Sequence, residues 1–62
     1  MCEVKVYLNK NGKEELVMED VGLIEPKGNK IDIQDIFGDK KSVKGEIIQI
    51  NLLTNKVFIK GK

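Results

Sequence analysis

The chain has 62 residues, of which 11 are lysine and 10 are acidic, and its formal charge is +1. So small a charge creates no overall field to attract nucleic-acid phosphates or an anionic membrane surface. No apolar run approaches the length of a membrane span, and the first residues lack the basic and apolar blocks of a signal peptide. With one free thiol, Cys2, we expect a soluble cytoplasmic protein that forms a single domain over residues 1–62.

A chain of this length is close to the lower limit for independent folding. It buries only about 60% of its unfolded surface, so one core gives marginal stability. Disulfides within the chain are excluded because Cys2 is the only cysteine, and zinc patterns are excluded because there is no histidine. Self-association is the common remaining source of stability, and we therefore expect a homodimer.

The first segment alternates apolar and polar residues at the period of a β-strand. Its expected inward residues are Cys2, Val4, Val6 and Leu8. The stretch NKNGK then predicts a hairpin, and EELVME a second strand. A two-residue Asn-Gly turn would place Val17 opposite Val6, whereas a three-residue loop over 10–12 would place Leu16 there. We favour the three-residue loop because it collects more apolar side chains on the Cys2 face.

Further strands are predicted at VGLIEP (21–26) and KIDIQDIF (30–37). Pro26 should mark a strand end or an edge, because proline cannot donate to a sheet ladder. In the next strand the alternation directs Ile31 and Ile33 inward, together with Ile36 or Phe37. The following short strand is KSV (41–43).

Gly45 is expected to separate KSV from another strand, EIIQINLL (46–53). There Ile48, Ile50 and Leu52 share one face, and Ile47 and Leu53 lie on the other. VFIK (57–60) is the last strand. The sequence therefore predicts an all-β fold, a small barrel or roll of six to seven short antiparallel strands, with no helix of ordinary length.

The residues needed for catalysis are scarce. There is no histidine for proton transfer near neutral pH and no arginine to clamp a carboxylate or phosphate, so an enzyme is not expected. Nucleic acid binding is an alternative, because Lys40, Lys41 and Lys44 lie close together in the sequence. Tyr7, Phe37 and Phe58 could stack on bases, although the apolar runs around the two phenylalanines favour core positions.

Cys2 stands where its thiolate can chelate a metal ion together with backbone nitrogens. If Met1 is retained, the terminal amine, the Cys2 amide nitrogen and the thiolate form adjacent five-membered rings. If Met1 is removed, the Cys2 amine and thiolate bind with the amide nitrogen of Glu3. A compact N/S set suits square-planar nickel(II) or copper(II) better than tetrahedral zinc.

A two-fold dimer would bring two Cys2 thiolates to one axis and complete such a site. From the residues alone, three roles for Cys2 remain open: a half-buried strand residue, a metal ligand, or a thiol for redox chemistry or an intermolecular disulfide.

The start MC running into EVKVYL, followed by EDVGLIEPKGNKIDIQDIFGDKKSVKGEIIQINLLTNKVFIK, resembles the CooT family of small nickel-binding proteins. The resemblance implies a homodimer of SH3-like or Sm-like barrels that binds Ni(II) between the two amino termini, with Cys2 as the ligand. It also implies a metallochaperone role in the maturation of carbon monoxide dehydrogenase, the client nickel metalloenzyme. Similar sequences have been labelled predicted RNA-binding proteins, which keeps the Lys40, Lys41 and Lys44 surface as the alternative.

Overall fold

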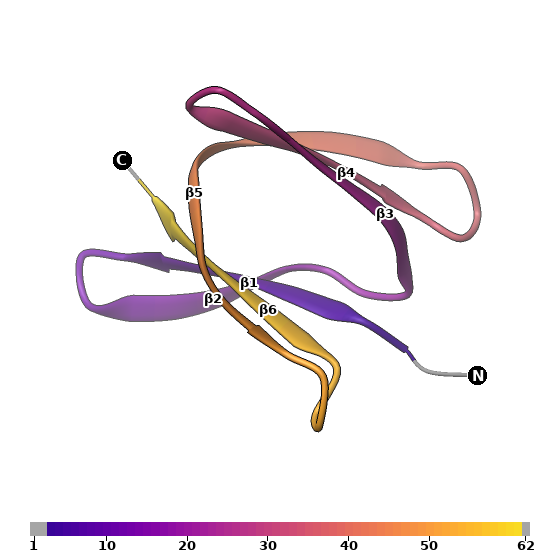
Figure 1. Ribbon diagram of the computed structural model, residues 1–62, viewed down its shortest axis with the longest axis horizontal. Coiled ribbons are helices and arrows are strands. Elements are labelled where there is room, and N and C mark those ends of the chain that lie inside the picture. Colours follow the sequence, from indigo (N-terminus) through magenta and orange to yellow (C-terminus); the bar gives the residue numbers. More distant parts are fainter. Residues whose placement is uncertain (1–2, 62) are drawn as a thin grey trace.

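The computed structural model describes residues 3–61, which form six strands and no helix. The strands are β1 (Lys5–Lys10), β2 (Lys13–Met18), β3 (Val21–Lys27), β4 (Lys30–Asp35), β5 (Lys40–Asn51) and β6 (Lys56–Gly61). They hydrogen-bond into one sheet in the order β2-β1-β6-β5-β4-β3 (Figure 1). The all-β class predicted from the sequence is confirmed.

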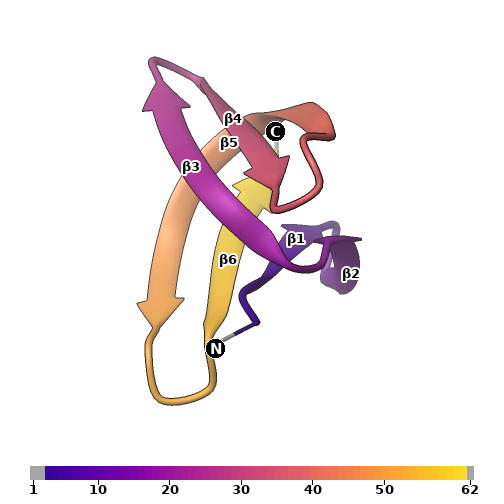
Figure 2. The same cartoon turned by 90° about the vertical axis from the view of Figure 1, so that its right-hand side faces the viewer.

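The long strand β5 joins two halves of this sheet. Its first part pairs with β4 and its second part with β6, so β5 passes from one layer to the other (Figure 1). The strands β3 and β4 form one layer with it, and β1, β2 and β6 the other, as the second view also shows (Figure 2). The sheet remains open, because its edge strands β2 and β3 are not hydrogen-bonded neighbours. Of the two predicted forms, the described residues adopt an open roll and not a closed barrel.

The prediction that all strands are antiparallel is wrong for one pair. β1 and β6 run parallel, with Val6 opposite Val57 and Leu8 opposite Ile59. This pair joins the first and last strands of the chain, so no hairpin turn dictates its direction. The alternation within a strand indicates which side chains face inward, but it carries no information about a partner so distant in sequence.

The core lies between the two layers. Its buried residues are Val6, Val21, Ile31, Ile33, Val43, Val57 and Ile59. The inward positions predicted for Val6, Ile31 and Ile33 are confirmed. Ile36 and Phe37 were predicted to supply another inward side chain, but they are 58% and 76% exposed.

The exposure of Ile36 and Phe37 follows from the turn that ends β4. The Asp35 carboxylate accepts hydrogen bonds from the amides of Phe37 and Asp39, both at 2.9 Å. A side chain that satisfies nearby backbone amides favours a turn over a continued strand. Phe37 therefore lies beyond the strand, and the alternation no longer applies to it.

The first hairpin uses the two-residue turn, so the predicted three-residue loop is wrong. Asn11 and Gly12 have φ values of 54° and 76°, and Lys10 pairs with Lys13. Positive φ at both central residues defines the turn that best matches strand twist and that Asn-Gly favours. A bulge further along the hairpin then places Met18 opposite Val6, a pairing that neither predicted register contained.

Gly45 was expected to separate two strands, yet β5 continues through it. Its φ is 151°, and a Cβ there would collide with the Lys60 carbonyl oxygen and lie 3.1 Å from Ile59 Cγ2. Glycine therefore allows β5 to bend and to approach β6 closely, which keeps one strand in both layers.

The second part of β5 departs from simple alternation. Ile47 packs against the core, but a bulge between Ile47 and Gln49 interrupts the pairing with β6. Ile48 and Ile50 are 51% and 58% exposed, and Leu52 and Leu53 lie in the turn after the strand. The assignment of these residues to two faces of one strand is therefore wrong beyond the bulge. Pro26 lies on the edge strand β3, as predicted.

Candidate metal centre at the amino terminus

The amino-terminal segment is fixed by two backbone hydrogen bonds just before β1. The Val4 carbonyl accepts from the Val21 amide at 3.0 Å, and the Lys5 amide donates to the Asn55 carbonyl at 3.0 Å. The Val4 side chain is half-buried and packs against the core, whereas Glu3 is exposed. Val4 and Lys5 are therefore held between the β2–β3 turn and the β5–β6 turn.

Both turns contain a residue other than glycine in the left-handed region. Asp20 has a φ of 52° and Asn55 a φ of 55°. Asp and Asn adopt this conformation more readily than other side chains do, which explains their presence here. The Asp20 carbonyl also accepts from the Ile36 amide at 2.9 Å, so the β4–β5 turn is joined to the same place.

Val4, Asp20 and Asn55 are thus the residues that hold the segment just before β1, and the sequence-based prediction did not include them. The sequence did contain a signal for these turns. Asp20 and Asn55 each stand directly before a strand, where Asp and Asn are typical turn residues. The hydrogen bonds that they support join distant parts of the chain and are not visible in a local pattern.

Met1 and Cys2, the predicted ligands, lie outside the described residues. Glu3, whose backbone nitrogen is the alternative ligand, is described and exposed. Within residues 3–61 no three His, Cys, Asp or Glu side chains are grouped as a metal ion would require. The predicted donor set, the thiolate and nitrogens of the terminus, therefore stays a prediction.

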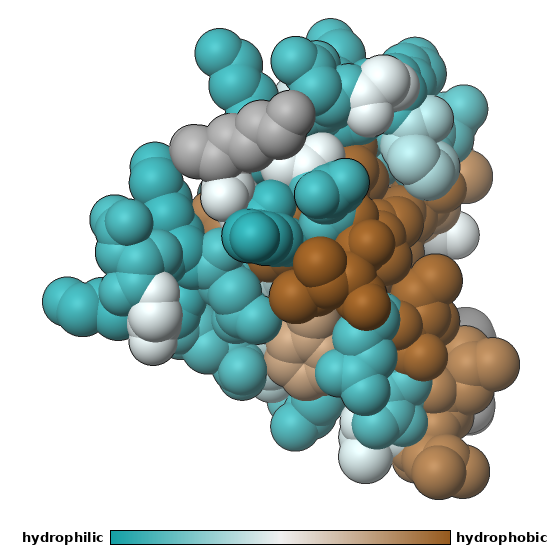
Figure 3. Space-filling view, turned by 60° about the vertical axis from the view of Figure 1, so that its left-hand side comes forward, coloured by the Kyte–Doolittle hydropathy of each residue, from teal (hydrophilic) through white to brown (hydrophobic). Residues whose placement is uncertain are grey.

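Large apolar side chains are exposed in the β4–β5 turn and from the end of β5 into the β5–β6 turn. They are Ile36, Phe37, Ile50, Leu52 and Leu53, here called the apolar rim. The Ile36 amide bonds to Asp20, next to the Val21 that bonds to Val4, and Leu52 and Leu53 share the β5–β6 turn with Asn55. Apolar side chains also form a broad band at one side of the face seen in Figure 3. Contiguous exposed apolar patches are typical of surfaces that contact another molecule.

The three lysines of the nucleic-acid alternative do not share one face. Lys40 pairs with Gln34 and Lys44 with Lys30, while Lys41 pairs with the buried Ile33. Because side chains alternate along a strand, Lys40 and Lys44 lie on the outer face of β5 and Lys41 on the opposite one.

The aromatic residues are also placed differently from expectation. Phe58 is not in the core cluster, and its ring stacks on that of Tyr7 with 5.6 Å between centroids. Lys56 Nζ lies 5.6 Å from the centroid of the Tyr7 ring. These three residues lie on β1 and β6, away from Lys40 and Lys44 on β5.

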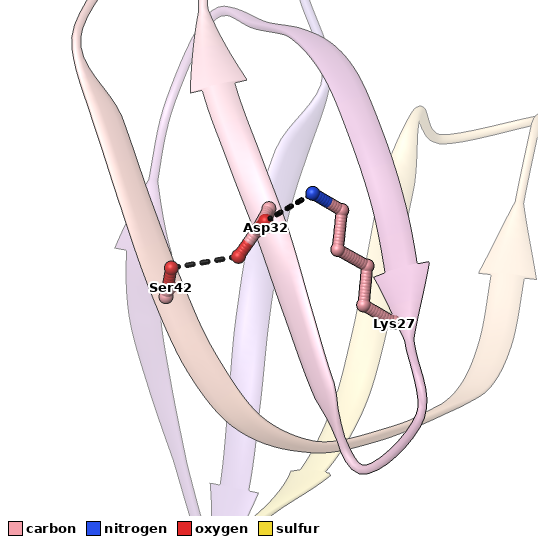
Figure 4. A network of polar contacts seen from close by, with 3 residues as sticks. All are labelled: Lys27, Asp32 and Ser42. Atoms are coloured by element: carbon pink, nitrogen blue, oxygen red, sulfur yellow. Dashed lines mark hydrogen bonds and ion pairs between the residues drawn. The ribbon is translucent and has the colours of Figure 1, made fainter.

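A second polar group, which the sequence did not reveal, crosses β3, β4 and β5 (Figure 4). The Ser42 hydroxyl donates to the Asp32 carboxylate at 2.7 Å, and Lys27 Nζ lies 3.1 Å from the same carboxylate. The Ser42 hydrogen bond and then that of Lys27 lower the pKa of Asp32. The hydrogen bond to Asp32 in turn raises the pKa of Lys27.

The fold and these anchoring bonds together define a class, that of small all-β domains whose segment before β1 is held between two turns. The chain belongs to the CooT family, described as CO dehydrogenase accessory protein CooT, whose family model matches residues 1–60. This is a family of accessory proteins of CO dehydrogenase rather than of catalysts. Among the described residues, no helix is long and apolar enough to cross a membrane.

Relatives support this membership. An uncharacterized protein of Methanocaldococcus jannaschii is 51% identical over 61 residues, covering 98% of this chain and 100% of the relative. An uncharacterized protein of Archaeoglobus fulgidus is 36% identical over 45 residues, 73% of this chain and 100% of the relative. A crystal structure provisionally assigned as CooT of Carboxydothermus hydrogenoformans superposes with a TM-score of 0.86 at 26% identity, and the match covers 98% of both chains.

Proposed function

We propose that this protein is a nickel(II)-binding accessory protein, or metallochaperone, for the maturation of a nickel enzyme such as CO dehydrogenase. The observation that carries the proposal is the family match, which extends over residues 1–60 and so includes Cys2. CO dehydrogenase is a nickel enzyme, and Cys2 is the only thiol of the chain. Nickel(II) prefers nitrogen and sulfur ligands in a square-planar arrangement, which the terminus can supply.

The ligands in this proposal are the Cys2 thiolate and backbone nitrogens. With Met1 retained they include its terminal amine, and with Met1 removed they include the amide nitrogen of Glu3. Either set has too few donors to fill a square plane securely without a further ligand. A second Cys2 from another copy of the chain would supply one, which makes the homodimer part of the same proposal.

The apolar rim supports association at the terminus. Leu52 and Leu53 are 80% and 96% exposed, and a second copy that covered them would approach the neighbouring segment that Asn55 holds. Burial of apolar area stabilises an interface by about 25 cal/mol per Å², so several large side chains contribute substantially. A symmetric contact here would bring the two amino termini toward one axis.

A site that lies on the dimer axis and is open to solvent suits a protein that transfers its metal. Exposed ligands can be replaced stepwise by those of a client enzyme, whereas an enclosed structural site resists release. The Cys2 thiol must lose a proton to bind nickel, so binding releases protons and weakens as the pH falls.

The test is a nickel titration followed by thiolate-to-nickel charge-transfer absorption. The unmodified chain should develop this absorption to saturation, and Cys2→Ser should lose it and bind nickel far more weakly. Cys2→Ser is a sharp control because it keeps the terminal amine and every backbone nitrogen. Equal nickel binding by the two proteins would exclude the proposed site.

A further inference from the structure

The outer face of β3, β4 and β5 carries a row of lysines from three neighbouring strands. Lys27 pairs with Lys30 across β3 and β4, and Lys30 pairs with Lys44 across β4 and β5. Residues directly opposite each other share a face, and like charges in such positions destabilise the sheet. All three lysines are exposed, so this lysine row presents concentrated positive charge to the solvent.

The next row on the same face is acidic. It contains Glu25 opposite Asp32, and Asp32 opposite Ser42. Asp32 binds Lys27 and Ser42, as Figure 4 shows, and so neutralises one lysine of the row. Within residues 3–61 no ion pair is formed by Lys30 or Lys44, so these two side chains keep their charge available.

Beyond the acidic row the face is only partly polar. Leu23 is 47% exposed and pairs with Gln34, which in turn pairs with Lys40. These residues help to line a depression of about 250 Å³ that also reaches Asp32 and Lys27. One face therefore offers, in succession, positive charge, negative charge and a shallow hollow with an apolar wall.

From this pattern we infer that the outer face of β3, β4 and β5 is a docking surface for an acidic, extended segment of a partner protein. Carboxylates on alternate residues of an extended segment lie about 7 Å apart on one side, within reach of the long lysine side chains. The exposed Lys30 and Lys44 would attract them, and a neighbouring basic or apolar residue of the segment would face Glu25 or Leu23.

A nucleic acid fits this face less well than an acidic peptide does. Tyr7 and Phe58, which could stack on bases, are on strands of the other half of the sheet. The surface also does not involve the amino terminus, so the inference stands or falls independently of nickel binding.

The inference can be tested with poly-L-glutamate as the probe, by following the backbone amide signals of the labelled protein in NMR at low ionic strength. Shifts should concentrate on β3, β4 and the first part of β5. The double variant Lys30→Gln/Lys44→Gln should weaken binding about fivefold, as expected for the loss of two exposed charge pairs.

The matched control is Lys10→Gln/Lys13→Gln, which removes the same charge from another directly opposed lysine pair. This control variant should lower the affinity for poly-L-glutamate less than twofold. An effect of about that size is expected at low salt from the reduced net charge alone. Equal losses in the two double variants, or no binding of poly-L-glutamate, would overturn the inference. Tighter binding of oligouridylate to the same strands would also overturn it, in favour of nucleic acid.

Discussion

The Val21 amide donates a hydrogen bond to the Val4 carbonyl at 3.0 Å and so ties the start of β3 to the segment before β1. The bond connects the two layers of the open roll at the point where the chain end leaves the fold. On the other side, the Lys5 amide bonds to Asn55 in the β5–β6 turn. The positions of Val4 and Lys5 therefore depend on both layers, although the sheet itself does not close.

Asn55 should be the more sensitive of these anchors to substitution. Its φ is 55°, a conformation that costs a residue with an ordinary Cβ about 1 kcal/mol. Asn55→Ala should lower the free energy of unfolding by about that amount in denaturant titrations. Asn55→Gly tolerates the same backbone conformation and should remain within about 0.5 kcal/mol of the unmodified protein. Equal losses for glycine and alanine would show that the Asn55 side chain, and not its backbone conformation, stabilises the turn.

Gly45 should tolerate no side chain. A Cβ there would meet the Lys60 carbonyl oxygen, so Gly45→Ala must separate β5 from β6 or twist β5 out of its bend. We expect a loss of more than about 2 kcal/mol in the free energy of unfolding, because overpacking and backbone strain act together.

The matched control for this glycine is Gly22→Ala on β3. There the nearest atom to a Cβ is Ile36 Cγ2 at 3.4 Å, an ordinary contact. Thermal unfolding of the two variants compares them directly. Similar midpoints would contradict the role assigned to Gly45 in bending β5.

Gly45 shows why the fold was only partly predictable from the sequence. Alternation identified Val6, Ile31 and Ile33 as core residues, because burial of one face follows directly from period two. The same pattern could not show that β5 would bend at Gly45 instead of ending there, since that depends on the approach of Lys60 from a distant strand.

The candidate site was predictable to a different degree. The assignment of Cys2 as a ligand rests on the chemistry of a thiolate beside backbone nitrogens, and it stays a prediction because Cys2 lies outside the described residues. The residues that hold the neighbouring backbone were not predictable, because the bonds of Val4 and Lys5 join them to residues 21 and 55. Phe37, by contrast, had a local signal, because Asp35 accepts from its amide and favours a turn, but the alternation was extended past that turn.

The apolar rim predicts a specific effect on association. Leu53 is 96% exposed, so Leu53→Glu should leave the fold intact and place a charge in the proposed interface. We expect the dimer dissociation constant, measured by sedimentation equilibrium, to rise more than about tenfold, since an unpaired charge at an interface core costs over 1.4 kcal/mol.

Leu23→Glu serves as its control, because Leu23 is 47% exposed on the outer face of β3 and is not part of the rim. The dimer dissociation constant of Leu23→Glu should stay close to that of the unmodified protein. If Leu53→Glu dimerises normally while Leu23→Glu does not, the interface lies on the β3 face instead.

The contact between Ser42 and Asp32 predicts a pH effect. The hydrogen bond from Ser42 is the largest cause of the lowered pKa of Asp32, so Ser42→Ala should raise that pKa. The pKa can be measured by an NMR titration of the Asp32 carboxyl carbon. Ser42→Thr keeps a hydroxyl and should leave the pKa low. An unchanged pKa in Ser42→Ala would assign the shift to Lys27 alone.

The sign of the linked stability follows from the direction of this shift. Because the folded pKa of Asp32 is below the unfolded one, the charged carboxylate stabilises the fold fully above about pH 4. This contribution is lost as the pH falls through the lower, folded pKa. In Ser42→Ala the contribution should be smaller, so stability should depend less steeply on pH over that acidic range.

The central claim is that two chains share one nickel ion through their Cys2 thiolates, and native mass spectrometry of the nickel-loaded protein measures this directly. The expected species is a dimer with one nickel ion, lighter by the protons that the thiols release on binding. Cys2→Ser should give no nickel-bound dimer under the same conditions. A monomer carrying its own nickel ion, or a Cys2→Ser dimer that retains the metal, would contradict the claim.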